Sequence, residues 1–137
     1  MSSNTKPIGV AYADQEINGS DVILSDRELG YTAAAQGTVT QATDKSTAVT
    51  LNRSAGRITM NAASLAATTN VSFTFNNNLI SSNDILILNV ASGATVAAYN
   101  IWVNSLSAGS ASITLRNTTA GALAEAVGIN FALIHCR

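Results

Sequence analysis

Short runs in which apolar and polar residues alternate are the main pattern along this chain. The clearest is 71–76, where Val71, Phe73 and Phe75 alternate with small polar residues. A period of two is typical of a β-strand that buries one face. Seven further segments predict short strands, and they are residues 38–43, 46–52, 57–60, 85–90, 99–104, 112–116 and 129–134.

Turn-forming residues separate these segments, for example Asn76–Asn78, Ser92–Gly93 and Ala108–Ser110. Strands at a spacing of roughly 10–13 residues with little helical periodicity predict an all-β fold. We expect an antiparallel β-sandwich of about eight strands, resembling a jelly roll. Two Ala-rich segments, 61–69 and 120–126, fit either a single helical turn or a loop.

Two of the expected strands carry more specific predictions. Residues 85–90 are almost continuously apolar, which predicts a strand that is buried on both faces. In the strand at 99–104, Trp102 points away from the core if Tyr99 and its alternating neighbours point toward it. An outward tryptophan suits a subunit interface or, together with Tyr99, the stacking of a sugar. Burial of this strand on both faces is the alternative.

Residues 1–36 show no sustained periodicity and predict an extended arm without a core of its own. A short strand at Val22–Leu24 and one helical turn at Asp26–Leu29 are the local structures we expect there. We therefore divide the chain into an arm, 1–36, and a β-body, 37–137. The apolar residues by which the arm is expected to dock on a partner are Ile8, Val10, Tyr12, Ile17, Val22, Leu24, Leu29 and Tyr31.

Charge is scarce and unevenly distributed. Charged residues make up 11% of the 137 residues, and the net charge is −1. The arm carries five acidic residues against Lys6 and Arg27, a net of −3, whereas the body has five basic and three acidic residues, a net of +2. This balance argues against a nucleic-acid-binding protein. A body covered mainly by Ser, Thr, Asn and Ala, with an arm that cannot fold alone, favours a structural role in a symmetric assembly.

Other classes are excluded by simple features of the sequence. A single cysteine excludes a disulfide scaffold, and no apolar run approaches the ~20 residues of a membrane-spanning helix. The start of the chain lacks an apolar stretch behind Lys6, so we expect no signal peptide and synthesis in a cytoplasm.

Few residues of the body could carry chemistry. Its side-chain carboxylates, Asp44, Asp84 and Glu125, are each expected in a turn or on the surface. His135 and Cys136 are adjacent near the C-terminus, where the last expected strand runs out. Neighbours on a strand point to opposite faces, which argues against a nucleophilic pair. We assign His135, like Trp102, to a subunit interface. We expect no catalytic activity, cofactor or metal site.

The body also resembles a β-domain that recurs in virion proteins of tailed bacteriophages. The most specific part of the resemblance is Gly37–Arg53, GTVTQATDKSTAVTLNR, followed by Gly56–Met60. Less specific parts are Phe73–Phe75, Asn83–Leu88, Ala108–Ser110 with Ile113, and Glu125 followed by Ile129–Ile134. Together they extend over residues 37–135.

The resemblance implies a structural protein on the outer surface of a phage head. A small body with a short arm is most similar to a capsid decoration (cement) protein. Such a protein binds the major capsid protein, commonly as a homotrimer, and braces neighbouring capsid subunits. It implies a virion location after synthesis in the bacterial host cytoplasm. A tail fibre, tail appendage or neck protein is one alternative, and a carbohydrate-binding module is another.

Overall fold

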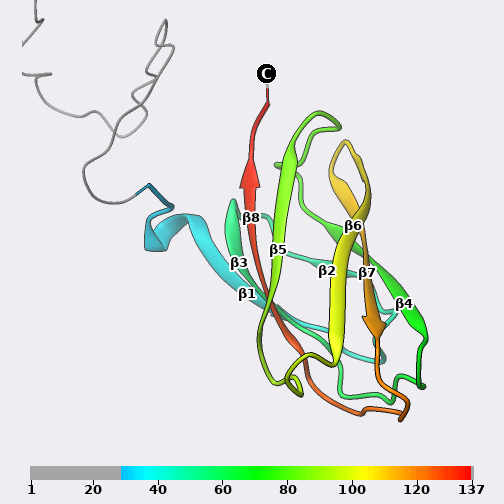
Figure 1. Ribbon diagram of the computed structural model, residues 1–137. Coiled ribbons are helices and arrows are strands. Elements are labelled where there is room, and N and C mark those ends of the chain that lie inside the picture. The colour runs from blue at the N-terminus through cyan, green and yellow to red at the C-terminus, as the bar shows by residue number, and fades with distance from the viewer. Residues whose placement is uncertain (1–28, 137) are drawn as a thin grey trace, which may run out of the picture. The chain divides into compact units, whose positions relative to one another are not determined.

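A computed structural model describes residues 29–136 of the chain and shows two four-stranded β-sheets (Figure 1). Both sheets belong to one compact unit that begins at Tyr31. A short 3-10 helix, η1 (Ala33–Ala35), precedes the first strand. The strands are β1 (Gln36–Thr40), β2 (Val49–Thr50), β3 (Ala55–Thr59), β4 (Asn70–Asn76), β5 (Ile85–Ser92), β6 (Tyr99–Ser107), β7 (Ser110–Asn117) and β8 (Gly128–Ile134).

The expected β-sandwich of eight strands is confirmed. The first sheet has the strand order β1-β3-β8-β5, and the second has the order β2-β4-β7-β6. The core lies between the sheets, where the rings of Phe75 and Phe131 meet at 4.8 Å between centroids. The largest fully buried aliphatic side chains around them come from β3, β7, β8 and the loops beside them, and they are Ile58, Met60, Ile113, Leu115, Val127, Ile129 and Leu133.

The expectation of a purely antiparallel fold is wrong for two strand pairs. β1 pairs with β3 in parallel, and β2 pairs with β4 in parallel. The first four strands alternate between the two sheets, so each of these pairs is connected through a strand of the opposite sheet. Hydrophobic periodicity is the same for parallel and antiparallel strands that bury one face, and it could not distinguish them.

The expectation that 85–90 is buried on both faces is also wrong. β5 is the edge strand of the first sheet, and its residues alternate in exposure. Leu86 is 7% exposed and faces the core, whereas Ile85 and Ile87 are 53% and 49% exposed on the outer face. The second sheet packs against the opposite face, and Ile85 and Ile87 therefore remain about half exposed.

The two Ala-rich segments are loops rather than helices, and they bond to each other. Leu65 and Leu123 form an isolated bridge through reciprocal backbone hydrogen bonds of 2.8 and 3.0 Å. The fully buried side chain of Asn117 donates to the carbonyl groups of Leu65, Ala66 and Gly121. A polar side chain thus satisfies loop carbonyls where no regular ladder continues.

Lys45 is buried, which the sequence pattern did not predict. It is 3% exposed, and its ammonium donates to the carbonyl groups of Asn61 and Glu125. Burial lowers the pKa of Lys45, and the Glu125 carboxylate partly opposes that shift. The ammonium therefore connects the two loops that flank it.

Among residues 29–136, no helix is long and apolar enough to cross a membrane.

Candidate interaction face on the first sheet

The outer face of the first sheet is built from cross-strand rows of side chains. One row is polar and contains Thr38, Arg57, Asn130 and Asn89. The next row contains Gln36, Ala55, Ala132 and Ile87, and a third joins Ile134 to Ile85. The face is therefore polar and cationic at the row of Arg57, and it becomes aliphatic at the row of Ile87, about two residues further along the strands.

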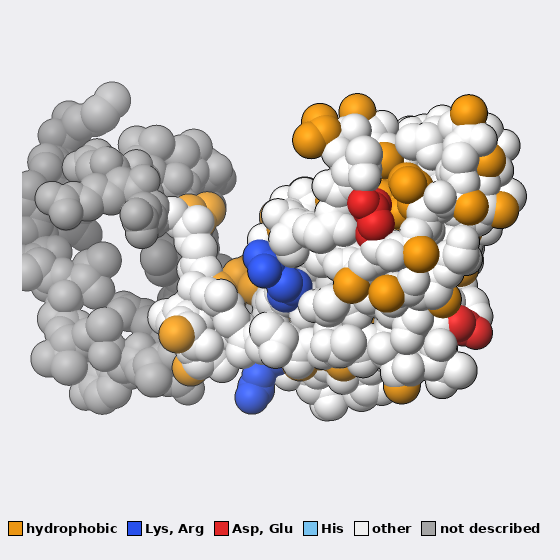
Figure 2. Space-filling view, turned by 90° about the horizontal axis from the view of Figure 1, so that it is seen from below, with side chains coloured by type: hydrophobic (Ala, Val, Ile, Leu, Met, Phe, Trp, Pro, Cys, Tyr) orange, Lys and Arg blue, Asp and Glu red, His pale blue; other side chains and the backbone are white. Residues whose placement is uncertain are grey.

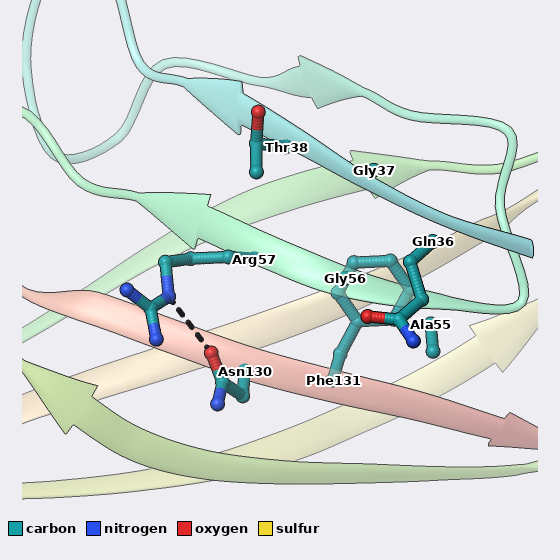
Figure 3. A pocket seen from close by; sticks show the side chains of 8 residues that line it. All are labelled: Gln36, Gly37, Thr38, Ala55, Gly56, Arg57, Asn130 and Phe131. Atoms are coloured by element: carbon teal, nitrogen blue, oxygen red, sulfur yellow. Dashed lines mark hydrogen bonds between the residues drawn. The ribbon is translucent and has the colours of Figure 1, made fainter. Parts of the chain in front are cut away.

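An open groove of about 560 Å³ lies where β1, β3 and β8 run side by side. Gly37 and Gly56 contribute only backbone to its middle, and polar side chains stand at both ends (Figure 3). Its lining residues are Gln36, Gly37, Thr38, Ala55, Gly56, Arg57, Asn130 and Phe131. In Figure 3, Arg57 and Asn130 stand together at one end of the groove, and Gln36 stands at the other.

Gly56 is required in the floor of this groove because β1 approaches β3 closely at this point. A Cβ atom at position 56 would collide with the backbone carbonyl of Gly37, its register partner. Backbone atoms rather than side chains consequently form the middle of the floor.

Arg57 is held in place by its neighbour on β8. Its Nε donates a hydrogen bond of 2.9 Å to Asn130 Oδ1, and this bond fixes how both groups are presented (Figure 3). Since Oδ1 is used as an acceptor, the Asn130 amide nitrogen and the terminal guanidinium nitrogens remain as donors. The end of the groove thus offers several hydrogen-bond donors and one positive charge.

Within residues 29–136, no carboxylate forms an ion pair with an arginine. Asp44 is bonded to Ser46 and Thr47, and these bonds lower its pKa. Glu125 accepts hydrogen bonds from Thr95, and these bonds lower its pKa in the same way. The charge of Arg57 is therefore not balanced by a described carboxylate.

An aliphatic stripe continues from the groove across β8 and β5. It consists of Ile85, Ile87 and Ile134, of which Ile134 is 46% exposed. Ile85 and Ile134 are direct cross-strand partners. Because β5 is an edge strand, every second residue also directs its backbone N–H and C=O groups away from β8. An uncharged, aliphatic edge of this kind is a favourable docking surface for another protein.

His135 and Asp84 meet beyond the end of the stripe. His135 Nδ1 donates a hydrogen bond of 3.0 Å to Asp84 Oδ2, and the Cys136 backbone N–H donates to Oδ1 at 3.2 Å. Asp84 also accepts from the Ser81 N–H, and these bonds lower its pKa to about 2. Asp84 closes a turn through its N–H bond to the Ser81 carbonyl, which is one of the two expected positions, and its side chain is 1% exposed.

The two adjacent residues at the C-terminal end are not joined to each other. No hydrogen bond links the His135 ring to the exposed Cys136 thiol in the described part of the chain. Asp84 instead accepts hydrogen bonds from the His135 ring and from the Cys136 backbone N–H. These bonds attach the C-terminal end of the chain to the start of β5. The expected interface role of His135 stays a prediction.

On the second sheet, Trp102 faces outward, as one of the two interpretations of its strand predicted. It is 39% exposed beside its cross-strand partner Thr114. Tyr99 is 9% exposed and lies in the core, where burial and then Glu125 raise its pKa to about 12. The expected pairing of Trp102 with Tyr99 as one sugar-stacking platform is therefore wrong, because the two rings lie on opposite faces of the strand.

Hydroxyl and amide groups surround Trp102. Asn104 Nδ2 donates to Thr114 Oγ1 at 2.6 Å, and the Thr114 and Ser72 hydroxyls are 2.6 Å apart. Charged side chains are equally sparse on the face seen in Figure 2, where uncharged polar groups and backbone predominate. The groups exposed on the face seen in Figure 2 are thus mainly neutral.

The expected docking residues of the arm are mostly outside the described residues. This applies to Ile8, Val10, Tyr12, Ile17, Val22 and Leu24, and to the expected helical turn up to residue 28. Leu29 is 92% exposed, and Tyr31 is 39% exposed with its hydroxyl donating to the Leu133 carbonyl. Tyr31 therefore lies beside the end of β8 that carries Ile134.

Neither the groove nor the stripe was predicted from the sequence. Arg57 alternates with the buried Ile58, so its outward position could have been inferred from the pattern. Its proximity to Asn130, 73 positions later, depends on strand pairing and carried no local signal. No cluster of His, Cys, Asp or Glu within residues 29–136 is arranged to hold a metal ion.

Comparisons with protein-family models, with curated proteins and with solved structures found no significant match for this chain.

Proposed function

We propose that this protein is a structural component of a virion that decorates the outer surface of a tailed-phage head. The observation that carries the proposal is the outer face of the first sheet. It combines the Arg57 groove with half-exposed Ile85 and Ile87 on the edge strand β5 and Ile134 on the neighbouring β8. The resemblance of residues 37–135 to phage virion β-domains supports the same role.

This surface costs little free energy to bury. Serine, threonine and asparagine side chains exchange water for partner hydrogen bonds at small net cost, whereas buried unpaired charges are expensive. The exposed aliphatic side chains contribute ~25 cal/mol for each Å² removed from water. A partner that covers the first sheet therefore gains hydrophobic burial and leaves only Arg57 in need of a counter-charge.

In this proposal the partner is the major capsid protein, and three copies form a homotrimer that braces neighbouring capsid subunits. Residues 1–36 supply a second attachment element. Binding to the assembled shell and not to dissociated subunits stabilises the shell by mass action. The protein is made in the host cytoplasm and ends on the capsid exterior.

The experiment is a head-binding assay with purified, undecorated heads and the purified protein. We expect saturable binding at on the order of hundreds of copies per head and higher resistance of decorated heads to heat. A handful of copies located at the tail or neck would instead support an appendage protein. No binding to heads at micromolar concentration would overturn the proposal.

Deletion of residues 1–30 tests the attachment role of the arm. We expect the truncated protein to keep its far-UV circular dichroism spectrum and to lose most of its head occupancy. Undiminished occupancy would contradict that role while leaving capsid binding itself intact.

A second candidate function is the binding of a neutral carbohydrate at Trp102. The observation in its favour is an exposed indole near the exposed Asn104 side chain, whose amide donates to the buried Thr114 hydroxyl. A glycan array with wild-type protein and Trp102→Ala would test it. A sugar-dependent signal that Trp102→Ala abolishes supports this function, and no signal with the wild-type protein excludes it.

A further inference from the structure

We propose that the groove between β1, β3 and β8 is a carboxylate-binding site for an extended acidic segment of a partner protein. The Glu or Asp side chain of that segment would bind Arg57 and Asn130, and its aliphatic neighbours would pack on Ile87 and Ile134. This inference rests on the proposed function only in assigning the partner to the phage head.

The chemistry of the ligand follows from the donors in the groove. Asn130 Oδ1 is engaged by Arg57 Nε, so the two side chains present donors in a shared orientation. A planar guanidinium matches a carboxylate with two parallel hydrogen bonds, and such charge-assisted bonds are about twice as strong as neutral ones. Because none of the described carboxylates pairs with Arg57, the incoming anion replaces no partner within the described residues.

The shape of the groove favours an extended chain. The groove follows the β1 and β3 strands and is open to solvent, and β1 is an edge of the first sheet. The backbone of Gly37 and Gly56 forms the middle of its floor, between the outward-facing rows of Gln36 and Arg57, and another backbone can approach there. A segment lying there projects alternate side chains toward the sheet.

The aliphatic stripe extends the site in one direction. Ala55 and Ala132 lie in the row next to Arg57 and in register with Ile87. Their small apolar side chains form a continuous surface between the groove and Ile87. The favoured segment therefore carries a carboxylate flanked by Val, Ile or Leu rather than a run of acidic residues.

A protein segment is favoured over an acidic sugar because the groove lacks an exposed aromatic ring. Phe131 is 4% exposed, and its ring packs in the core against Phe75. Saccharide sites commonly use an aromatic face, and the aromatic ring exposed on a sheet face of this protein, Trp102, belongs to the second sheet. An acidic monosaccharide is therefore a suitable competitor in the test.

The experiment titrates the full-length protein with short peptides and follows backbone amide resonances by NMR. The probes are acetylated, amidated heptapeptides of alternating threonine and valine with a central Glu, Gln or Lys. We expect the Glu peptide to shift resonances of Gly37, Gly56 and Asn130, and to bind roughly tenfold more tightly than the Gln peptide.

Two groove variants, Arg57→Gln and Asn130→Ala, and one control variant locate the binding. Arg57→Gln removes the charge, and Arg116→Gln is its matched control because Arg116 is an exposed arginine in β7 of the second sheet. We expect Arg57→Gln to erase the preference for Glu over Gln and Arg116→Gln to retain it. Asn130→Ala, which releases Arg57 Nε, should weaken binding of the Glu peptide several-fold.

Three outcomes would overturn the inference. They are equal binding of the Glu and Gln peptides, an undiminished Glu preference in Arg57→Gln, and glucuronate binding at the groove as tightly as the Glu peptide. Thermal unfolding of each variant verifies that it is folded before binding is compared.

The head-binding assay separates this inference from the proposed function. If wild-type protein binds heads and Arg57→Gln binds them equally well, the groove inference fails and the proposed function stands. If wild-type protein does not bind heads but the Glu peptide binds in an Arg57-dependent way, the proposed function fails and the groove inference stands.

Discussion

His135 Nδ1 lies 3.0 Å from Asp84 Oδ2, which joins the residue after β8 to the residue before β5. These two strands are already paired along their length, with Ile85 opposite Ile134. The side-chain bond therefore adds one more connection between β5 and β8, just beyond the pair of Ile85 and Ile134. It holds the exposed isoleucines on a fixed backbone.

Asp84 predicts a pH dependence of stability. Its pKa falls from 3.8 to about 2 in the folded protein, chiefly through the Ser81 backbone hydrogen bond. A carboxylate with a depressed folded pKa stabilises the fold above its unfolded pKa, and that stabilisation disappears as pH falls from about 4 through about 2. In urea titrations, Asp84→Asn should be less stable than wild type at pH 6, and the difference should shrink toward pH 2. A difference that is constant over this range would contradict the assignment.

Gly56→Ala should destabilise the protein because its Cβ meets the Gly37 carbonyl across the parallel pair. Relief requires β1 and β3 to separate, and overpacking of this kind costs about 1–3 kcal/mol. Gly121→Ala is the control, since a Cβ at that position has no neighbour within 4 Å. The urea midpoint should fall for Gly56→Ala and remain within error for Gly121→Ala. Equal midpoints would show that the strands can part freely.

Asn117→Ala should weaken the two loops that the Asn117 side chain connects. The substitution leaves the carbonyl groups of Leu65, Ala66 and Gly121 without this donor, and the expected loss is about 2–3 kcal/mol of unfolding free energy. Hydrogen exchange should accelerate at Leu65 and Leu123 before it does in β7. Asn100→Ala, at an exposed position of β6, should change neither measurement. An unchanged rate of hydrogen exchange at Leu65 would show that the Asn117 side chain does not stabilise these loops.

Ile87→Lys separates docking from folding. Ile87 is half exposed at a sheet edge, so the unfolding free energy should change by no more than about 0.5 kcal/mol. A lysine on the stripe places a charge where a partner is expected to bury aliphatic surface, so head occupancy should fall strongly. Thr74→Lys, at an exposed position of β4 on the second sheet, is the matched control and should bind as wild type. If Thr74→Lys lost head binding and Ile87→Lys retained it, the docking surface would be on the second sheet.

Much of the fold was predictable because one-sided burial leaves a period of two in the sequence. Val71, Phe73 and Phe75 showed it most clearly, and β4 buries Phe73 and Phe75. The outward position of Trp102 was one of two interpretations of the same alternation, and the structure selects it. The candidate interaction face was not predictable as a unit, since Arg57 and Asn130 are 73 positions apart and meet only through strand pairing.

By itself, the sequence determined the β-class, the approximate positions of the eight strands and the sparse charge of the body, because these depend on local residue order and composition. Only the tertiary structure decided which strands lie at the edges and which pairs run in parallel. That choice left Ile85 and Ile87 in solvent although their sequence is that of a core strand. It also buried Lys45 among loop carbonyls, a position that no local pattern indicates. The reason is that a residue's exposure depends on what packs against it, and those neighbours come from distant parts of the chain.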